Sequence, residues 1–340
     1  MRRVHALVIV ASASLTLTAC GAASGLRGAT TITLYNGQHP QTTAALVASF
    51  ERATGIMVVV RDGDEDVLAQ QIAQEGSGSP ADVYYSENSP DLQFLSEKGL
   101  LSAIQASTLA KVPRRYSSPS GDWLGVTARV SGIVYNTRLV SPTAVPTSVM
   151  ALAGQHWADK VGLAPSETDF LPVITSVEHY YGRATALSWL LALKRNAGSH
   201  VYPDNETLVA EVNSGQVAVG IIDHYYWYRL RYELGSSSLH SRFTTFAPRD
   251  PGYVLDVSGA AVLRSSRHES AAQRFVAFLV SAAGQRIIAD SQSYEYPLGS
   301  GVAAAPILPR FASLQPAQLS INQLGDGSGA VTLLHEAQLL

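Results

Sequence analysis

A dense aromatic cluster lies at residues 221–230, which read IIDHYYWYRL. Tyr225 and Tyr226 are adjacent there, and each phenol hydroxyl needs a polar partner once it is buried, so core packing explains the pair poorly. Neighbours on a strand point to opposite faces, whereas two long phenols at a strand-to-helix junction can reach one point. One target small enough for both is a metal ion.

Other polar side chains follow strand-like runs elsewhere in the chain. His39 follows TITLY, Glu87 follows ADVYY, residues 166–169 (SETD) follow KVGLA, and residues 223–226 (DHYY) follow QVAVGII. In open α/β sheets, ligands bind beyond the carboxyl ends of the strands. We therefore expect four strand ends, two from each of two lobes, to supply polar groups to a common crevice.

The donor types restrict the metal. Imidazole, carboxylate and two phenols supply nitrogen and oxygen but no sulfur, which disfavours soft-ligand sites and cysteine-rich zinc sites. A free phenol has a pKa of about 10, so ionising two of them at neutral pH needs a strong positive charge nearby. A trivalent ion supplies that charge. Two phenolates and Glu87 balance iron(III), and neutral His39 is then the fourth donor beside Tyr225 and Tyr226.

Alternating patterns predict the elements that position these groups. Residues 31–35, 56–60 and 81–85 are strand-like, and helical spacing follows at 40–55 and 64–76. Repeated strand–helix alternation predicts an α/β protein whose parallel sheets carry helices on both faces. Residues 121–136 and 251–263 read as extended strands that cross between two doubly wound α/β domains, like a hinge.

The composition fits a protein of this kind. The chain has 340 residues, 46% hydrophobic and 15% charged, which is long enough for two globular domains. Its net charge of −3, without basic runs, gives no electrostatic case for a nucleic-acid partner.

The N-terminus reads as an export signal. Residues 6–19 are apolar and uncharged, but a bilayer-spanning helix needs about 20 residues. The stretch ends in LTAC at 17–20, which resembles a bacterial lipobox, in which the cysteine is lipidated. We expect residues 1–19 to be a lipoprotein signal peptide and 20–30 a tether lipidated at Cys20. An ordinary signal peptide with an incidental cysteine is the alternative.

Four segments carry a family resemblance. YNGQH, PADVYYSEN, GQVAVGIIDHYYWY and SGAAVL resemble the periplasmic ferric-ion-binding proteins, also called bacterial transferrins, and the resemblance runs from about residue 31 to the end. Proteins of that family are the solute receptors of iron(III) ABC importers and are not enzymes. The resemblance implies an ABC permease and its ATPase as partners, an extracytoplasmic monomer anchored to the cell membrane, and His39, Glu87, Tyr225 and Tyr226 as iron ligands.

The resemblance also implies a two-lobed type II periplasmic-binding-protein fold. We expect residues 31–130 plus 253–300 to form lobe 1, which supplies the histidine and the glutamate. Residues 131–252 plus 301–340 are expected to form lobe 2, which supplies the tyrosines.

The chain departs from the family at one place. Members that use a synergistic phosphate or carbonate have small residues after the strand KVGLA, where this chain has Glu167, Thr168 and Asp169. A helix N-terminus attracts anions, but two carboxylates there would occupy or repel that place. Octahedral iron with four protein ligands has two positions left. We expect Glu167 or Asp169 to fill one, directly or through water, so that no exogenous anion is required.

A structural role is the alternative for this stretch. Ser166 as N-cap and Asp169 at the third helical position would form a capping box, and the two roles are compatible. Asp223 stands where relatives often have asparagine, so we expect it to lie beside the ligands rather than bind iron. Asn88 and Asn205 are weaker candidates, near positions that the family uses around the anion.

Two other classes of function stay open at this stage. A receptor of the same fold for a sugar or another small organic solute could use the aromatic cluster as a stacking platform. An exported hydrolase could use Glu87 and Asp169 as a carboxylate pair. No nucleophile elbow, zinc-protease motif or P-loop pattern supports catalysis.

Overall fold

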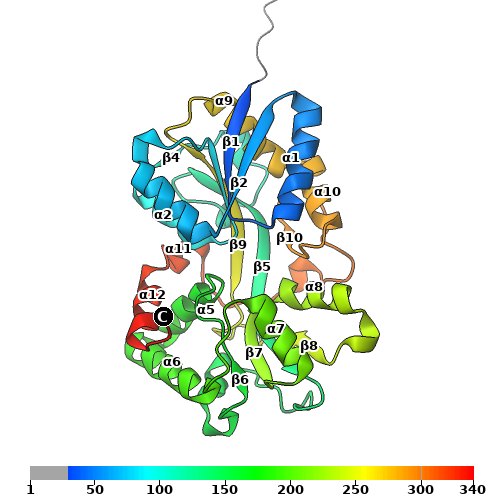
Figure 1. Ribbon diagram of the computed structural model, residues 1–340. Helices are drawn as coiled ribbons and strands as arrows, with labels where there is room; N and C mark the ends of the chain where they lie inside the picture. The colour runs from blue at the N-terminus through cyan, green and yellow to red at the C-terminus, as the bar shows by residue number, and fades with distance from the viewer. Residues whose placement is uncertain (1–29, 300) are drawn as a thin grey trace, which may run out of the picture.

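Two α/β lobes lie one above the other, joined by strands that run through both (Figure 1). This computed structural model describes residues 30–299 and 301–340. Cys20, the predicted signal peptide and most of the predicted tether lie outside the described residues. Within the described residues, no helix combines the length and the apolar character needed to cross a bilayer.

The upper lobe in Figure 1 follows the predicted strand–helix alternation. Strand β1 pairs in parallel with both β2 and β3. Gly55 ends the first helix in the left-handed conformation, φ 70°, which glycine adopts without a steric penalty. The elements of this part are β1 (Thr31–Asn36), α1 (Pro40–Thr54), β2 (Met57–Asp62), α2 (Glu65–Glu75), β3 (Val83–Ser86), α3 (Ser89–Glu97), β4 (Leu101–Ser102) and α4 (Ala106–Leu109).

The connection between the lobes is built by β5 and β9. Strand β5 (Trp123–Asn136) is buried along its whole length. Its first part, up to Val130, pairs antiparallel with β9 (Leu255–Leu263), and its second part, from Ser131, pairs antiparallel with β7 (Val219–Asp223). The same strand therefore belongs to the sheets of both lobes, as the predicted crossing requires. The predicted lobe limits stay a prediction.

The lower lobe contains β7 with β6 (Val161–Gly162) parallel to it and β8 (Ser241–Thr244) on β5. Helix α12 packs on α5 and α6, while α9 packs on β9 and α10 on α1 in the upper lobe. The short helix α11 contacts both α3 and α5. The remaining elements are α5 (Phe170–Tyr181), α6 (Arg183–Ala197), α7 (Asn205–Ser214), α8 (His224–Leu234), α9 (Glu269–Leu279), α10 (Ala282–Asp290), β10 (Tyr296–Pro297), α11 (Ile321–Leu324) and α12 (Ser328–Glu336).

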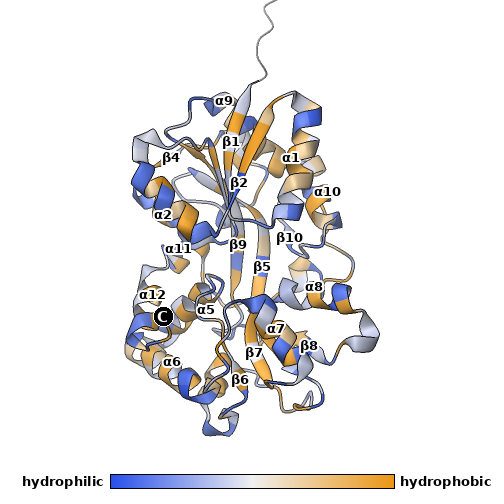
Figure 2. Ribbon diagram, viewed as in Figure 1, coloured by the Kyte–Doolittle hydropathy of each residue, from blue (hydrophilic) through white to orange (hydrophobic). Residues whose placement is uncertain are grey.

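The strands are mostly apolar, with polar interruptions at the waist between the lobes. Figure 2 shows β1, β2 and β7 largely in orange, whereas β5 and β9 carry blue segments where they pass between the lobes. Arg129 on β5 and Asp256 on β9 are buried there. A buried charge needs a compensating partner, so these positions mark the part of the core that does more than pack.

The predicted start of one helix is wrong. Helix α5 begins at Phe170, and its preceding residue, Asp169, makes no side-chain capping bond. Ser166 Oγ donates to Pro203 O at 3.0 Å instead. The capping box therefore does not form, because residues 166–169 fold as turns that bring the carboxylate of Asp169 toward the waist instead of the helix end.

Candidate metal centre

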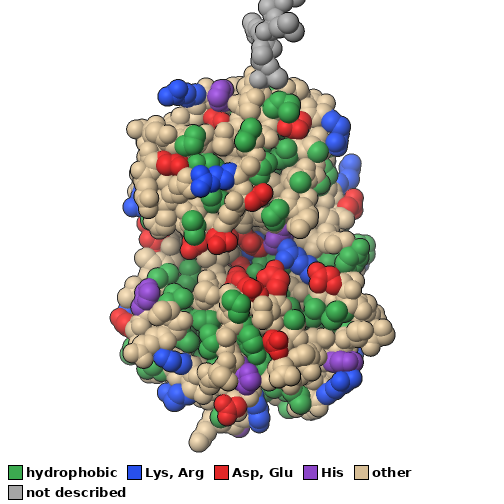
Figure 3. Space-filling model, viewed as in Figure 1, with side chains coloured by type: hydrophobic (Ala, Val, Ile, Leu, Met, Phe, Trp, Pro, Cys, Tyr) green, Lys and Arg blue, Asp and Glu red, His purple; other side chains and the backbone are tan. Residues whose placement is uncertain are grey.

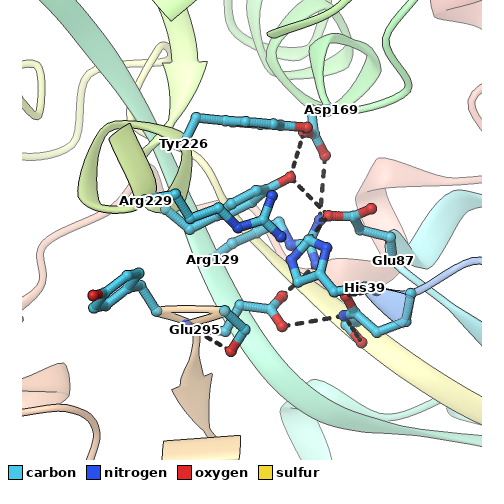
Figure 4. A network of polar contacts seen from close by, with 12 residues as sticks. His39, Glu87, Arg129, Asp169, Tyr226, Arg229 and Glu295 are labelled. Carbon is cyan, nitrogen blue, oxygen red and sulfur yellow. Dashed lines mark hydrogen bonds and ion pairs between the residues drawn. The ribbon is translucent and has the colours of Figure 1, made fainter. Parts of the chain in front are cut away.

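The four predicted donors and Asp169 lie together at the waist. His39 precedes α1 and Glu87 precedes α3, so both follow strands of the upper lobe. Asp169 precedes α5, and the two tyrosines, Tyr225 and Tyr226, lie in the first turn of α8. Figure 4 shows His39 and Glu87 facing Asp169 and Tyr226 across the gap. Strand ends from both lobes thus converge as the sequence pattern predicts.

Oxygen atoms crowd around the phenols. Tyr225 Oη lies 2.7 Å from Glu87 Oε1 and 2.8 Å from Asp169 Oδ2. Tyr226 Oη donates to the same Asp169 Oδ2 at 2.8 Å. Two phenol protons must serve three close oxygen–oxygen contacts, because an ionised carboxylate only accepts. The cluster is one proton short, an arrangement that a cation would stabilise.

The phenols are protonated in the absence of a metal. Tyr225 and Tyr226 are buried, and burial followed by the charge of Asp169 raises the pKa of each well above its ordinary value. A phenolate in this position therefore needs a strong cation at the oxygen.

His39 is a neutral donor without a partner. Its side chain is 9% exposed, and Nε2 makes no hydrogen bond among the described residues. Burial, and then the charges of Arg229 and Arg129, lower the pKa of His39 well below its usual value. Nε2 lies 3.5 Å from Glu87 Oε1. A buried ring nitrogen that lacks a partner is costly in a protein interior, unless a ligand completes it.

Arg129 is a residue of this cluster that the sequence patterns did not predict. Its guanidinium is fully buried on β5 and contacts three carboxylates, Glu87 at 3.0 Å, Asp169 at 3.3 Å, and Glu295 (Figure 4). Although burial alone lowers the pKa of Arg129, Glu295 and Glu87 raise it well above its ordinary value. The guanidinium also lies 5.1 Å from the Tyr225 ring centroid. A single arginine in an otherwise apolar strand was the available signal.

Hydrogen bonds join the two lobes beside the donors. Thr168, part of the stretch where the chain departs from the family, donates from Oγ1 to Glu65 Oε1 at 2.6 Å and so bridges the lobes. Asn88 Nδ2 donates to Glu65 at 2.8 Å and to Asp169 Oδ1 at 2.9 Å. Asn205 Nδ2 lies 3.5 Å from Asp169 Oδ2. Both asparagines therefore contact the aspartate carboxylate, and their predicted role around the bound ion stays a prediction.

The remaining candidates lie further out. Glu167 accepts a hydrogen bond from the Asn205 backbone at 3.3 Å and makes none to the phenols. Burial and the charge of Asp169 raise the pKa of Glu167 to about 8. Asp223 is buried on β7, opposite Ser131 of β5, and burial raises its pKa well above the usual range.

Neighbouring rings and cations frame the phenols. Arg229 lies 5.0 Å from the Tyr225 ring centroid and 5.9 Å from that of Tyr226. His224 Nε2 lies 2.8 Å from Tyr294 O, and burial lowers the pKa of His224 to about 3, so it serves the structure as a neutral ring.

Within residues 30–299 and 301–340, no three His, Cys, Asp or Glu side chains form a metal-binding group by themselves. The phenol oxygens of Tyr225 and Tyr226 lie among these side chains and extend the donor set. With them, the donor set is one imidazole nitrogen and hard oxygens, which fits a hard cation.

Two α/β lobes that share strands, with facing donors at their waist, define a two-lobed solute-binding protein. The chain belongs to the family of bacterial extracellular solute-binding proteins, whose family model matches residues 35–291.

Two relatives and one solved structure are similar to nearly the whole chain. The chain is 34% identical over 334 residues to the Fe(3+)-binding periplasmic protein of Serratia marcescens, covering 98% of this chain and 97% of that protein. It is 37% identical over 308 residues to the major ferric iron-binding protein of a serogroup A Neisseria meningitidis strain, covering 90% and 92%. The structure of iron-bound HitA from Pseudomonas aeruginosa matches with a TM-score of 0.86 and 41% identity, covering 91% of this chain and 99% of that chain. The predicted resemblance to periplasmic ferric-ion-binding proteins and the predicted fold are thereby confirmed.

Proposed function

We propose that this chain is an extracytoplasmic receptor that captures iron(III) between its lobes and delivers it to an ABC permease and its ATPase. His39 and Glu87 bind the ion from one side, and Tyr225 and Tyr226 bind it from the other. Relatives that are named for ferric iron and cover more than nine-tenths of the chain support this assignment. As a solute-binding protein, the chain needs no catalytic group.

The observation that carries the proposal is the shared oxygen cluster. Tyr225 and Tyr226 both contact Asp169 Oδ2 at 2.8 Å, so two phenols and two carboxylates already surround one small volume. Iron(III) in that volume replaces the two phenol protons. It also stabilises the oxygen–oxygen contact for which no phenol proton is left. Because the phenols are protonated before iron binds, capture releases protons, and acid weakens the site.

We also propose Asp169 as the fifth iron ligand, in preference to Glu167, which contacts the Asn205 backbone instead. Two phenolates with Glu87 and Asp169 carry four negative charges, one more than iron(III) neutralises. Arg129 lies within 3.3 Å of both carboxylates, and Arg229 lies against both phenol rings, so these two cations offset the fourth charge together with that of Glu295, the third partner of Arg129. The protein then supplies its own anion, and no phosphate or carbonate is needed.

The same proposal places the protein outside the cytoplasmic membrane. Export with lipidation at Cys20 would anchor a monomer beside the permease. The names of the relatives, which are periplasmic or extracellular proteins, support export. The alternative of a sugar receptor is disfavoured by the tyrosine rings, because Arg129 and Arg229 lie against the Tyr225 ring that a sugar would stack on.

An absorption titration tests the proposal. Purified protein titrated with ferric nitrilotriacetate in phosphate- and carbonate-free buffer should gain a visible iron–phenolate band that saturates at one iron per chain. Tyr225→Phe combined with Tyr226→Phe should remove the band and lower iron affinity by more than about 100-fold, since losing even the outer partners of a metal ligand costs about 10–100-fold. Tyr228→Phe, the same change two residues further along α8, should leave the band intact.

Two results count against the proposal in different ways. A band that survives in the double variant places the metal elsewhere and refutes the receptor site. A band that forms only when phosphate or carbonate is added refutes the role of Asp169 but leaves the four other ligands in place.

A further inference from the structure

Carboxyl groups from both lobes line one approach to the waist. A cavity of about 590 Å³ opens there to solvent. Beyond the groups already described, its walls carry Asp62, Asp64, Asp66, Asp204 and Glu206, and its described lining contains no lysine or arginine. Figure 3 shows acidic side chains along both edges of the hollow between the lobes. We call these five residues the acidic mouth.

The inner end of this cavity is the candidate metal centre. His39 and Tyr226 line it together with Glu87 and Asp169. His39 is 8% exposed, and its Nε2 has no hydrogen-bond partner among the described side chains, so an unsatisfied donor atom lies at the end of the approach. A solute that enters through the acidic mouth therefore reaches the donors directly.

The outer carboxylates of the mouth, Asp64 and Asp66, make few contacts that stabilise the fold. Asp64 precedes α2 but makes no side-chain capping bond, and it is exposed. Asp66 accepts one hydrogen bond, from the Val67 backbone at 2.8 Å. Neither forms an ion pair with another described residue; within the mouth, Glu206 pairs with Arg229 at 3.3 Å. Their negative field is therefore directed into the solvent of the cleft instead of being neutralised by the protein.

We propose that the acidic mouth selects the form in which iron(III) reaches the site. This inference rests on the proposed function and adds the class of substrate: ferric species that are neutral or positively charged are admitted, and negatively charged ferric chelates are disfavoured. A cleft lined by one sign of charge concentrates counter-ions and changes association rates by roughly 10–1000-fold. An anionic chelate would also have to bring its carboxylates against Asp169, whose oxygen already contacts both phenols.

Two donors that differ in charge test the inference. Ferric nitrilotriacetate carries little net charge, because three ligand charges balance the metal and only a bound water ionises further near neutral pH, whereas ferric dicitrate is strongly negative. Second-order rates of iron transfer are measured by stopped-flow at the iron–phenolate band, with protein in excess and at low salt. The variant is Asp64→Asn with Asp66→Asn, in which asparagine keeps the capping preference at residue 64. The control is Glu97→Gln with Glu269→Gln, which removes the same charge at exposed positions outside the cavity.

The mouth variant should take iron from ferric dicitrate roughly three- to tenfold faster than the unchanged protein, and from ferric nitrilotriacetate within about twofold of it. The control variant should match the unchanged protein with both donors. Raising the salt to about 1 M, where the screening length is about 3 Å, should bring the two variants together.

Several results overturn the inference. One is a ratio of citrate rate to nitrilotriacetate rate that is the same in the unchanged protein, the mouth variant and the control at low salt. Another is a citrate rate that does not depend on protein concentration, because release from the chelate would then precede any contact with the mouth. If neither donor produces the band in the unchanged protein, the proposed function itself fails and this inference fails with it.

Discussion

The two lobes contribute unlike halves to the candidate site. In the lower lobe, Tyr225, Tyr226 and Asp169 are already joined to one another by hydrogen bonds at 2.8 Å. In the upper lobe, His39 Nε2 has no hydrogen bond from the described part of the chain. Glu87, also in the upper lobe, is contacted by the hydroxyl of Tyr225 on α8 and by the guanidinium of Arg129 on β5.

This difference separates two steps, capture of the ion by the lower half and closure of the upper half over it. In the proposed site, the lower half has its charge and its oxygen geometry assembled within one lobe, so we expect it to hold a partial hard-ion site when the lobes move apart. We expect the upper half to complete that site only when it faces the lower half. Arg129 lies between them on β5, the strand that both lobes share, and contacts a carboxylate from each.

Removing the shared cation should have the largest effect. Arg129→Gln leaves Glu87, Asp169 and Glu295 without the guanidinium that they contact, and breaking a buried ion pair from one side costs about 3–5 kcal/mol. Urea unfolding of the iron-free protein measures the loss. The deficit should shrink as the pH is lowered, because burial raises the pKa of Glu295, and its protonated carboxyl no longer needs the cation.

A surface pair provides the control for this prediction. Arg183→Gln breaks a pair with Glu336 at 2.7 Å whose partners are each 44% exposed, and solvent screens such a pair so that it contributes little to stability. Equal losses for the buried and the surface substitution would contradict the role of Arg129 as the link between the halves.

A second prediction sets one donor of each half against the other. Tyr226→Phe removes one of two phenolates, so the visible band should weaken by about half, and affinity should fall by more than about 100-fold. His39→Gln keeps both phenolates, so the band should remain while affinity falls by about 10–100-fold. Iron titrations followed by absorbance measure both quantities. A His39→Gln protein without the band would mean that the lower half is not preassembled.

Local sequence patterns were sufficient for the strand-end donors. His39, Glu87, Tyr225 and Tyr226 each follow a recognisable strand, so their common position depends only on the α/β topology. The turn before α5 was harder, because its hydrogen bonds depend on partners such as Pro203 that lie far along the chain. The predicted capping box failed for that reason.

Long-range partners could not be predicted in the same way. Glu295 meets Arg129 across 166 positions, and Glu65 meets Thr168 across 103. Neither pair leaves a periodic or spacing signal, since the pairing of β10 with β5 brings Glu295 to Arg129, and the approach of the two lobes brings Glu65 to Thr168. Arg129 is the only charged residue of β5, which is a signal for a buried counter-charge but does not tell which residue supplies it.

The smallest predicted effect concerns the bonds that hold the halves together. Thr168→Val removes the hydroxyl that donates to Glu65 at 2.6 Å, with little change in shape. A net hydrogen bond contributes about 1 kcal/mol, so the equilibrium between open and closed lobes should shift about fivefold toward open. Small-angle X-ray scattering of the iron-free protein should then give a larger radius of gyration, and iron affinity should fall by up to that factor, because the full set of proposed ligands meets only in the closed form. Thr332→Val, an exposed position on α12, should change neither. If Thr168→Val weakens iron binding while the radius stays fixed, the hydroxyl acts on the ligands themselves, and the separation of capture from closure does not hold.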